Sequence, residues 1–328
     1  MKQTFMYLTA MMMASALFFS CATRYAISAP GENLSALTKV TDTEEPCITP
    51  FGGDNGKDLF FASRENKTFY NIYKKENAFS NAMSQKTSGK NFNIYPTYNA
   101  ENEKIAFSCQ MEGSINPDIY VMNSNQGQAL TQITETMNAY EGHPCFSMDG
   151  KFLVYDRTTN EYYRKANLWG SSLLVVQNTE IWLRNLQSGE NTLLGNGSQP
   201  TFSPNGTSIA YVKYSADAKS CCIWTMNLDG SNQTQVTDPR KGYAFSPRFS
   251  PDGSKIVFEL LKKEKKDYDI YIIDIDGNNL TQVTINKSYD GQPYWTTDNY
   301  IYFVSDRGSK MNDRQIWRFQ VQGNLLNK

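Results

Sequence analysis

Apolar and polar residues alternate in short segments of this chain, and the same alternating segment returns six times after residue 37. Each copy contains two large apolar residues spaced two positions apart. These are Leu59/Phe61, Ile105/Phe107, Leu153/Tyr155, Ile209/Tyr211, Ile256/Phe258 and Ile301/Phe303. Residues two positions apart lie on the same face of a β-strand. The pattern therefore predicts six strands that each bury one face.

A second recurring pair, an isoleucine followed by tyrosine or tryptophan, comes after each of these strands. The six copies are Ile72-Tyr73, Ile119-Tyr120, Ile181-Trp182, Ile223-Trp224, Ile270-Tyr271 and Ile316-Trp317. Branched and aromatic residues favour strands. No segment after residue 30 has the apolar period of about 3.6 residues that marks a helix. The sequence therefore predicts an all-β protein.

A proline opens each copy and sets the length of the repeat. The six are Pro46, Pro96, Pro144, Pro200, Pro247 and Pro293. Their spacings of 50, 48, 56, 47 and 46 residues lie close to the length of a four-stranded propeller blade, about 40–50 residues. Such a blade buries its apolar faces against its neighbours. The repeat predicts a six-bladed β-propeller of four-stranded antiparallel blades.

Turn residues lie between the first and second strands of four copies. They are Asn55-Gly56, Asp149-Gly150, Asn205-Gly206 and Asp252-Gly253, and the second and sixth copies depart from this pattern. Such pairs favour a two-residue hairpin turn in which both central residues have a positive φ. We therefore expect tight two-residue turns at these places.

A fourth-strand phrase ends several copies and also stands before the first one. It reads LTQIT at Leu130 to Thr134, LTQVT at Leu280 to Thr284 and LTKVT at Leu37 to Thr41. The sixth copy carries only a weak candidate for this strand, at Asn324 to Lys328. We therefore expect the N-terminal strand at Leu37 to Thr41 to complete the last blade and close the ring, which removes an open sheet edge.

The fifth copy carries the phrases by which the repeat resembles a known family. They are Ser250-Pro251-Asp252-Gly253, Asp269-Ile270-Tyr271, Asp276-Gly277 and Leu280 to Thr284, with Ser305-Asp306-Arg307 and Ser63-Arg64 as strand-two endings in other copies. These phrases resemble the propeller repeats of the TolB family. The resemblance covers nearly all of residues 37–328 and implies an envelope β-propeller that binds proteins. That family also has an α/β domain before its propeller, which we do not expect here because few residues separate Cys21 from the first strand.

The N-terminal residues resemble a bacterial lipoprotein signal. Lys2 precedes an apolar run from Phe5 to Phe19, which is too short to span a membrane, and Ser20-Cys21 follows. We expect cleavage before Cys21 and lipidation there, although Phe18 departs from the usual residue type. An ordinary signal peptide with an incidental cysteine is the alternative. The expected domains are a signal peptide at 1–21, a tether at 22–33 and the propeller at 34–328.

The composition excludes some classes of binding and metal site. The chain has 32 Lys and Arg, 33 Asp and Glu and a net charge of −1, which gives no electrostatic reason for binding nucleic acid. Its single histidine excludes multi-histidine metal sites. The five cysteines after Cys21 have no metal-ligand spacing, and Cys47 and Cys145 each follow an anchor proline, so they are expected at equivalent sites that cannot pair. We expect buried free thiols, with a Cys109–Cys145 bridge left open, and no cofactor or metal.

Candidate binding residues gather on one face of the expected ring, where loops between the second and third strands meet the connections between blades. The third copy has an insertion there, with 25 residues between Tyr155 and Ile181 against 11 between Phe258 and Ile270. Aromatic and arginine side chains dominate binding hot spots. The candidates are Tyr162, Tyr163, Arg164 and Trp169 in the insertion, Arg64, Arg157 and Arg307 at strand ends, and Tyr140, His143, Arg240 and Tyr243 in connections.

Each candidate also has a structural interpretation. The arginines can tie strands by salt bridges, the insertion aromatics can pack onto their own blade, and His143 can make a local hydrogen bond. The sequence favours a non-catalytic, lipid-anchored propeller, a monomeric ring that binds an envelope protein or complex through the insertion. Alanine and threonine after Cys21 favour the outer membrane, facing the periplasm. The alternative is a propeller that binds or cleaves carbohydrate in its central funnel with carboxylates and aromatics.

Overall fold

The computed structural model describes residues 32, 34–53, 58–78, 80, 82–125, 129–159, 178–215, 220–262, 267–308 and 313–322. Blade 1 consists of β2 (Cys47–Gly52), β3 (Leu59–Glu65), β4 (Phe69–Lys75) and β5 (Met83–Gln85). Blade 2 consists of β6 (Phe92–Asn99), β7 (Lys104–Gln110), β8 (Asp118–Asn123) and β9 (Thr131–Gln132). Blade 3 consists of β10 (Ala139–Phe146), β11 (Phe152–Thr159), β12 (Thr179–Asn185) and β13 (Asn191–Asn196). Blade 4 consists of β14 (Ser198–Phe202), β15 (Ser208–Tyr214), β16 (Cys221–Asn227) and β17 (Thr234–Gln235). Blade 5 consists of β18 (Gly242–Phe249), β19 (Lys255–Lys262), β20 (Tyr268–Asp274) and β21 (Thr281–Gln282). Blade 6 consists of β22 (Asp290–Trp295), β23 (Tyr300–Ser305), β24 (Gln315–Gln320) and β1 (Ser35–Lys39).

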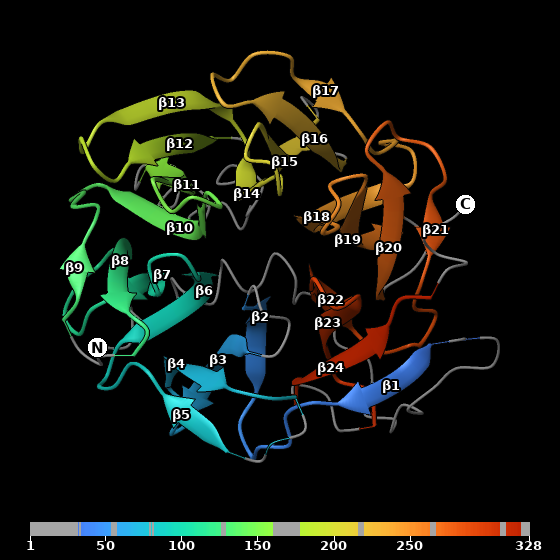
Figure 1. Cartoon of the computed structure of the whole chain (residues 1–328), viewed down its shortest axis with the longest axis horizontal. Helices are drawn as coiled ribbons and strands as arrows, with labels where there is room; N and C mark the ends of the chain where they lie inside the picture. Colours follow the sequence, from blue (N-terminus) through green and yellow to red (C-terminus); the bar gives the residue numbers. More distant parts are fainter. Residues whose placement is uncertain are drawn as a thin grey trace, which may run out of the picture.

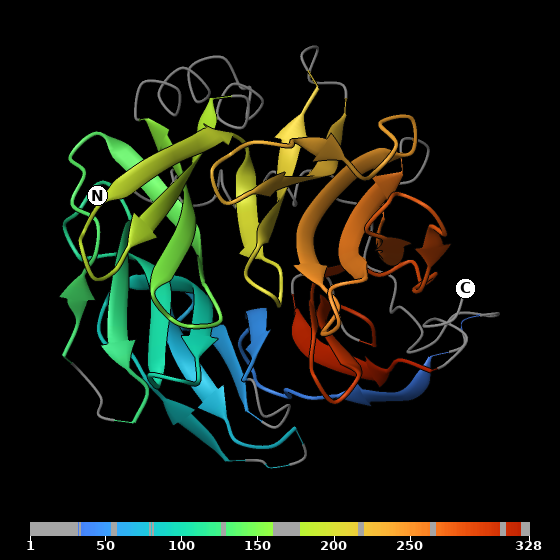
Figure 2. The ribbon, with the colours of Figure 1, turned by 45° about the horizontal axis from the view of Figure 1, so that its top comes forward.

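The blades stand around a common centre, each an antiparallel meander that runs outward from its first strand (Figure 1). Figure 2 shows the same ring turned by 45°. Single parallel bridges, Tyr70 to Phe92 and Cys221 to Tyr243, link neighbouring blades. The predicted all-β, six-bladed propeller is confirmed. The described residues contain no helix, and hence none long and apolar enough to cross a membrane.

The N-terminal strand completes the last blade, as predicted. β1 pairs antiparallel with β24, with Thr38 opposite Arg318 and Lys39 opposite Trp317. Figure 1 shows β1 as the outermost strand beside β24. At the centre of the same junction, the rings of Phe51 in blade 1 and Tyr294 in blade 6 lie 4.5 Å apart. The first and last blades are therefore linked by the chain that runs from β1 in blade 6 to β2 in blade 1, and by direct packing.

The period-two pairs form the core between the blades. All twelve of their side chains have 0 % solvent exposure. The isoleucines of the second recurring pair are buried as well, for example Ile72, Ile119 and Ile270. Alternation along the second strand therefore places large side chains on the faces where neighbouring blades pack, which is what the sequence pattern predicted.

The innermost strand of every blade contains the same β-bulge, which corrects the alignment of the first copy. In each blade the register shifts around a residue with φ between 47° and 56° that directly precedes a proline. In blade 1 this pair is Thr49-Pro50, so the anchor proline is Pro50, and the prediction of Pro46 is wrong. Pro46 lies just before β2. With Pro50 the first spacing becomes 46 residues, in line with the other copies.

The turns between the first and second strands also differ from the prediction. In blade 5, the backbone N of Gly253 donates to the carbonyl of Ser250 at 2.9 Å, and the N of Ser250 donates to the carbonyl of Lys255 at 2.9 Å. Only the glycine has a positive φ, 74°, and Gly150 and Gly206 behave in the same way. The loop is therefore a type I turn closed by a left-handed glycine, longer than a two-residue hairpin.

All five cysteines after Cys21 are buried free thiols, so the expectation of free thiols is confirmed and the bridge from Cys109 to Cys145 is not formed. The argument from equivalent sites was wrong, however. Cys145 directly follows its bulge proline, whereas Cys47 lies three residues before Pro50. The residue equivalent to Cys145 in blade 1 is Phe51.

Candidate binding face and central belt

At one end of the ring, the first strand of each blade begins and the second strand ends. We call this end the insertion face. The register defines it: Ala139 lies opposite Thr159 in blade 3, and Gly242 lies opposite Lys262 in blade 5. The connection from β11 to β12 leaves from this face. Its residues 160–177, which include Tyr162, Tyr163, Arg164 and Trp169, lie outside the described residues, as does Cys21.

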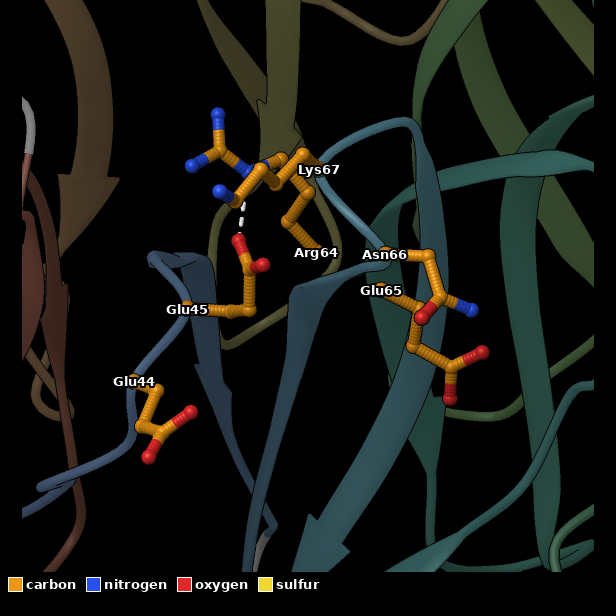
Figure 3. A pocket seen from close by; sticks show the side chains of 6 residues that line it. All are labelled: Glu44, Glu45, Arg64, Glu65, Asn66 and Lys67. Atoms are coloured by element: carbon orange, nitrogen blue, oxygen red, sulfur yellow. Dashed lines mark hydrogen bonds and ion pairs between the residues drawn. The ribbon is translucent and has the colours of Figure 1, made fainter.

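Arg64 lines a shallow hollow on the insertion face of blade 1 (Figure 3). The lining residues are Glu44, Glu45, Arg64, Glu65, Asn66 and Lys67. The Nε of Arg64 donates to Oε2 of Glu45 at 2.8 Å, and both side chains are partly exposed. Glu65 is directed to the other side of β3, where its Oε2 accepts a hydrogen bond from Asn71. The hollow therefore has mixed charge, and Arg64 carries a structural ion pair that stays open to solvent.

Arg157 is held more tightly. Its Nε donates to Oε1 of Glu141 at 2.7 Å, and its Nη2 donates to the hydroxyl of Tyr155 at 3.0 Å. The guanidinium also lies over the ring of Trp182, 4.5 Å from the centroid. Burial raises the pKa of Glu141, and hydrogen bonding and the charge of Arg157 act against that rise. Arg157 thus ties the first three strands of blade 3 together.

Arg307 is buried, with 1 % exposure. Its Nη2 lies 2.5 Å from Oδ2 of Asp290, and its Nη1 lies 3.3 Å from Oε2 of Glu32. Burial raises the pKa of Asp290 to about 6, although Arg307 favours the ionised form. The arginine therefore joins blade 6 to the residues before β1 inside the protein and does not lie on its surface.

The remaining connection residues divide between surface and interior. Arg240 is exposed and pairs with Asp238, Nη2 to Oδ2 at 2.7 Å. Tyr140 is buried. Tyr243 is half-buried and packs against the apolar cluster of blades 4 and 5. All three lie at the insertion face, but of these only Arg240 presents its side chain fully to solvent.

His143, on β10, is the residue before the bulge proline of blade 3, which we call the bulge residue. It contacts residues that link three blades. Its Nδ1 lies 2.8 Å from Oδ2 of Asp156, and its ring centroid lies 3.9 Å from that of Tyr95 in blade 2. The same Oδ2 accepts a hydrogen bond of 2.8 Å from the backbone N of Gln199, the bulge residue of blade 4. The local hydrogen bond expected for His143 is therefore present, and it fixes the plane of the imidazole.

This chain of contacts continues around the ring. Oε1 of Gln199 accepts from the backbone N of Ser246 at 2.7 Å. Oγ of Ser246 donates to Glu259 at 2.9 Å, and Glu259 accepts from the backbone N of Gln292 at 3.2 Å. Oε1 of Gln292 then accepts from the backbone N of Thr49 at 2.9 Å. We call these residues the central belt: Tyr95, His143, Asp156, Gln199, Ser246, Glu259, Gln292 and Thr49.

Glu259 is the most heavily bonded carboxylate of the central belt. It is buried, and it also accepts a hydrogen bond from the hydroxyl of Tyr289 at 2.9 Å. Burial raises its pKa, and hydrogen bonds from Ser246, Tyr289 and Gln292 oppose the rise. Asp156 and Glu259 occupy equivalent positions in β11 and β19, one residue after Tyr155 and Phe258. Two carboxylates thus anchor the bulges of the blades that follow them.

The sequence did not predict the central belt beyond His143. The recurring prolines do locate the belt residues, because most of these residues directly precede a bulge proline. The local sequence does not show, however, that they have a positive φ or that they contact neighbouring blades. Among the described residues, no group of three or more His, Cys, Asp or Glu side chains is arranged to hold a metal ion. The belt is therefore a hydrogen-bonded frame around the centre of the ring.

Comparison with known proteins identifies the repeat. Residues 176–328 match the family model described as TolB beta propeller domain. This part of the chain carries propeller repeats of the TolB type. The Tol-Pal system protein TolB from Francisella tularensis subsp. mediasiatica (strain FSC147) is 23 % identical to this chain in an alignment of 233 residues, which covers 61 % of this chain and 53 % of that protein. The chain spans about half the length of the curated relatives it matches.

Solved structures share the fold of this TolB-type propeller. A putative TolB from Agrobacterium tumefaciens superposes with a TM-score of 0.61 at 20 % identity, covering 87 % of this chain and 97 % of that one. TolB from Acinetobacter baumannii gives 0.59 at 18 %, covering 82 % and 65 %. An oligogalacturonate lyase in complex with manganese gives 0.61 at 14 %, covering 94 % and 97 %. At these identities the likeness concerns the fold alone.

Proposed function

We propose that this chain is a lipid-anchored envelope propeller that binds a protein partner through its insertion face and has no catalytic role. The TolB-type repeat and the curated relatives named Tol-Pal system protein TolB support an envelope protein that works by protein binding. Lipidation at Cys21 would hold the propeller at the outer membrane, facing the periplasm. The partner would be an envelope protein or complex.

The observation that carries this proposal is an exposed apolar pair on the insertion face. Met137 and Ile115 have the highest exposure of the described large hydrophobic residues, 89 % and 64 %. They are neighbours, because Nδ2 of Asn116 donates to the carbonyl of Met137 at 2.8 Å. Aromatic residues, methionine and arginine are the types enriched in protein interfaces.

This apolar pair lies near Thr159, the last described residue before the blade 3 insertion. Met137 comes two residues before Ala139, which pairs with Thr159 at the start of the insertion. Arg64 and Arg240 lie on the same face with solvent access. The proposed surface therefore consists of Met137, Ile115, the exposed arginines and the insertion. It leaves out Arg307, which is buried, and Arg157, which is bound within its blade.

The experiment is site-specific photo-cross-linking in native envelopes. A photoreactive residue replaces Met137 on the insertion face or, as the matched control, Met148 in the turn at the opposite end of blade 3, which is 49 % exposed. We expect one identified envelope protein to be cross-linked from position 137 and not from position 148. Equal adducts from both positions, or none from position 137, would contradict binding through this face.

Lipid anchoring has its own test. Cys21→Ser should release the protein from the membrane fraction, because the acyl chains supply the membrane affinity. Retention of the variant on membranes would contradict it. The likeness to oligogalacturonate lyase concerns the fold alone, so the carbohydrate alternative stays a prediction, to be taken up if position 137 gives no protein adduct.

A further inference from the structure

A second set of equivalent positions surrounds the centre of the ring, one residue after each bulge proline. We call it the inner ring: Phe51, Thr97, Cys145, Thr201, Arg248 and Tyr294. Neighbouring members touch between blades, since Sγ of Cys145 lies 3.7 Å from Oγ1 of Thr201, and the rings of Phe51 and Tyr294 lie 4.5 Å apart. Five of the six are neutral. Arg248 is the only charged residue of the inner ring.

Arg248 has no acidic partner among the described residues. Its Nη1 donates to the carbonyl of Pro247 at 3.0 Å, and its Nε is buried without any acceptor. The arginines discussed above behave differently, because Arg64, Arg157 and Arg307 each contact a carboxylate. A guanidinium has five donors, so most of the hydrogen-bonding capacity of Arg248 is unused.

The surroundings of Arg248 do not neutralise its charge. Burial lowers the pKa of Arg248, and the groups that act in the opposite direction are the thiol of Cys145 and the phenol of Tyr294. Neither group is a carboxylate. An uncompensated buried charge is costly, and an anion at this place would remove that cost. Arg248 as a whole residue is half-buried and not fully enclosed, which leaves an approach for a small group.

A cation with unused donors suits a planar anion that accepts several hydrogen bonds. A carboxylate meets that description, because its two oxygens accept bidentate bonds from arginine.

We propose that the inner ring binds a carboxylate group, held by Arg248. The group belongs either to a small free acid, such as a sugar acid, or to an acidic side chain of a peptide that enters the ring. The proposal does not depend on protein binding at the insertion face, since it rests on different residues.

The test is calorimetric titration of the purified protein with D-glucuronate and with the peptide Gly-Glu-Gly, using D-glucose and Gly-Gln-Gly as neutral controls at equal ionic strength. We expect wild type to bind an acidic probe and not its neutral counterpart. Arg248→Met should bind at least about tenfold more weakly, the loss expected for a charge-assisted bidentate contact. Lys151→Met removes an exposed cation that pairs with Asp149 and should bind as wild type does.

The pattern of binding assigns the source of the carboxylate. Binding of glucuronate alone indicates a free acid, binding of the peptide alone indicates a peptide, and binding of both shows that the site reads only the carboxylate. No binding by wild type, or equal binding by Arg248→Met, overturns the proposal. Arg248→Lys serves if the methionine variant does not fold; it keeps the charge but loses the bidentate geometry, and it should bind more weakly than wild type. Undiminished binding by this variant would contradict the bidentate contact.

Discussion

The bulges of the central belt allow a comparison in which the same backbone change has opposite effects at two sites. Thr49 and His143 both precede a bulge proline, with φ of 53° and 47°. Thr49 has a buried hydroxyl without a hydrogen-bond partner, whereas His143 bonds to Asp156 and stacks on Tyr95. We therefore expect Thr49→Gly to stabilise the protein and His143→Gly to destabilise it.

The magnitudes follow from these contacts. A left-handed backbone costs a non-glycine residue about 1–2 kcal/mol, and replacement by glycine removes that cost but adds about 0.5–1 kcal/mol of chain entropy. For Thr49→Gly, removing an unbonded buried hydroxyl adds about 1 kcal/mol or more of stability, and losing the methyl group subtracts about 0.8 kcal/mol. The net result is a stabilisation of about 1 kcal/mol. The backbone hydrogen bond from Thr49 to Gln292 is kept.

For His143→Gly the same backbone gain is outweighed. The hydrogen bond to a carboxylate contributes about 1.5–3 kcal/mol and the aromatic contact about 0.5–1.5 kcal/mol, so we expect a net loss of about 2 kcal/mol. Urea unfolding followed by tryptophan fluorescence measures both variants against wild type. If both variants are more stable than wild type, backbone strain alone decides and the side-chain contacts of the central belt do not. If both are less stable, the argument from backbone strain is wrong.

Four further variants, at three positions, test the buried groups. Burial raises the pKa of Asp290 to about 6, so the folded state holds this proton more tightly than the unfolded state does. The stability gained in this way is present below about pH 4 and is lost as the pH rises through 6. Asp290→Asn should remove this pH dependence of stability, worth about 3 kcal/mol, from unfolding curves recorded between pH 4 and 7. Glu259→Ala should cost about 3 kcal/mol or more in urea unfolding because it leaves three donors unbonded, whereas Glu259→Gln should cost less; equal losses would contradict the role of its acceptors. Gly291→Ala should also destabilise the protein, because a Cβ there would lie 1.9 Å from Oε2 of Glu259; unchanged thermal stability would show that the central belt yields easily.

Much of the fold could be predicted because its signals are local and repeated. The period-two pairs predicted the buried second strands, and the LTKVT phrase predicted that β1 completes blade 6. The first anchor was misplaced because Pro46 and Pro50 stand four residues apart, and only the bulge geometry distinguishes them. The turns were longer than expected because the serine before each turn accepts from the glycine and only the glycine takes a positive φ.

The candidate site was less predictable because its contacts join distant residues. The bond between Asp156 and Gln199 spans 43 positions, and nothing in the local sequence marks Arg307 as buried and Arg240 as exposed. The missing partner of Arg248 and the exposure of Met137 depend on where neighbouring blades place their side chains. The order of strands did predict that Arg64, Arg157 and Arg240 lie at the same end of the ring, and the binding role of that face stays a prediction.

The measurement that tests the central claim most directly is quantitative capture from native envelopes by wild type and by a variant that lacks residues 160–172. The protein cross-linked from position 137 should be recovered with wild type and lost with the deletion variant, while the variant keeps the thermal stability of the ring. Recovery of the same protein in equal amount by a folded deletion variant would contradict binding through the insertion face.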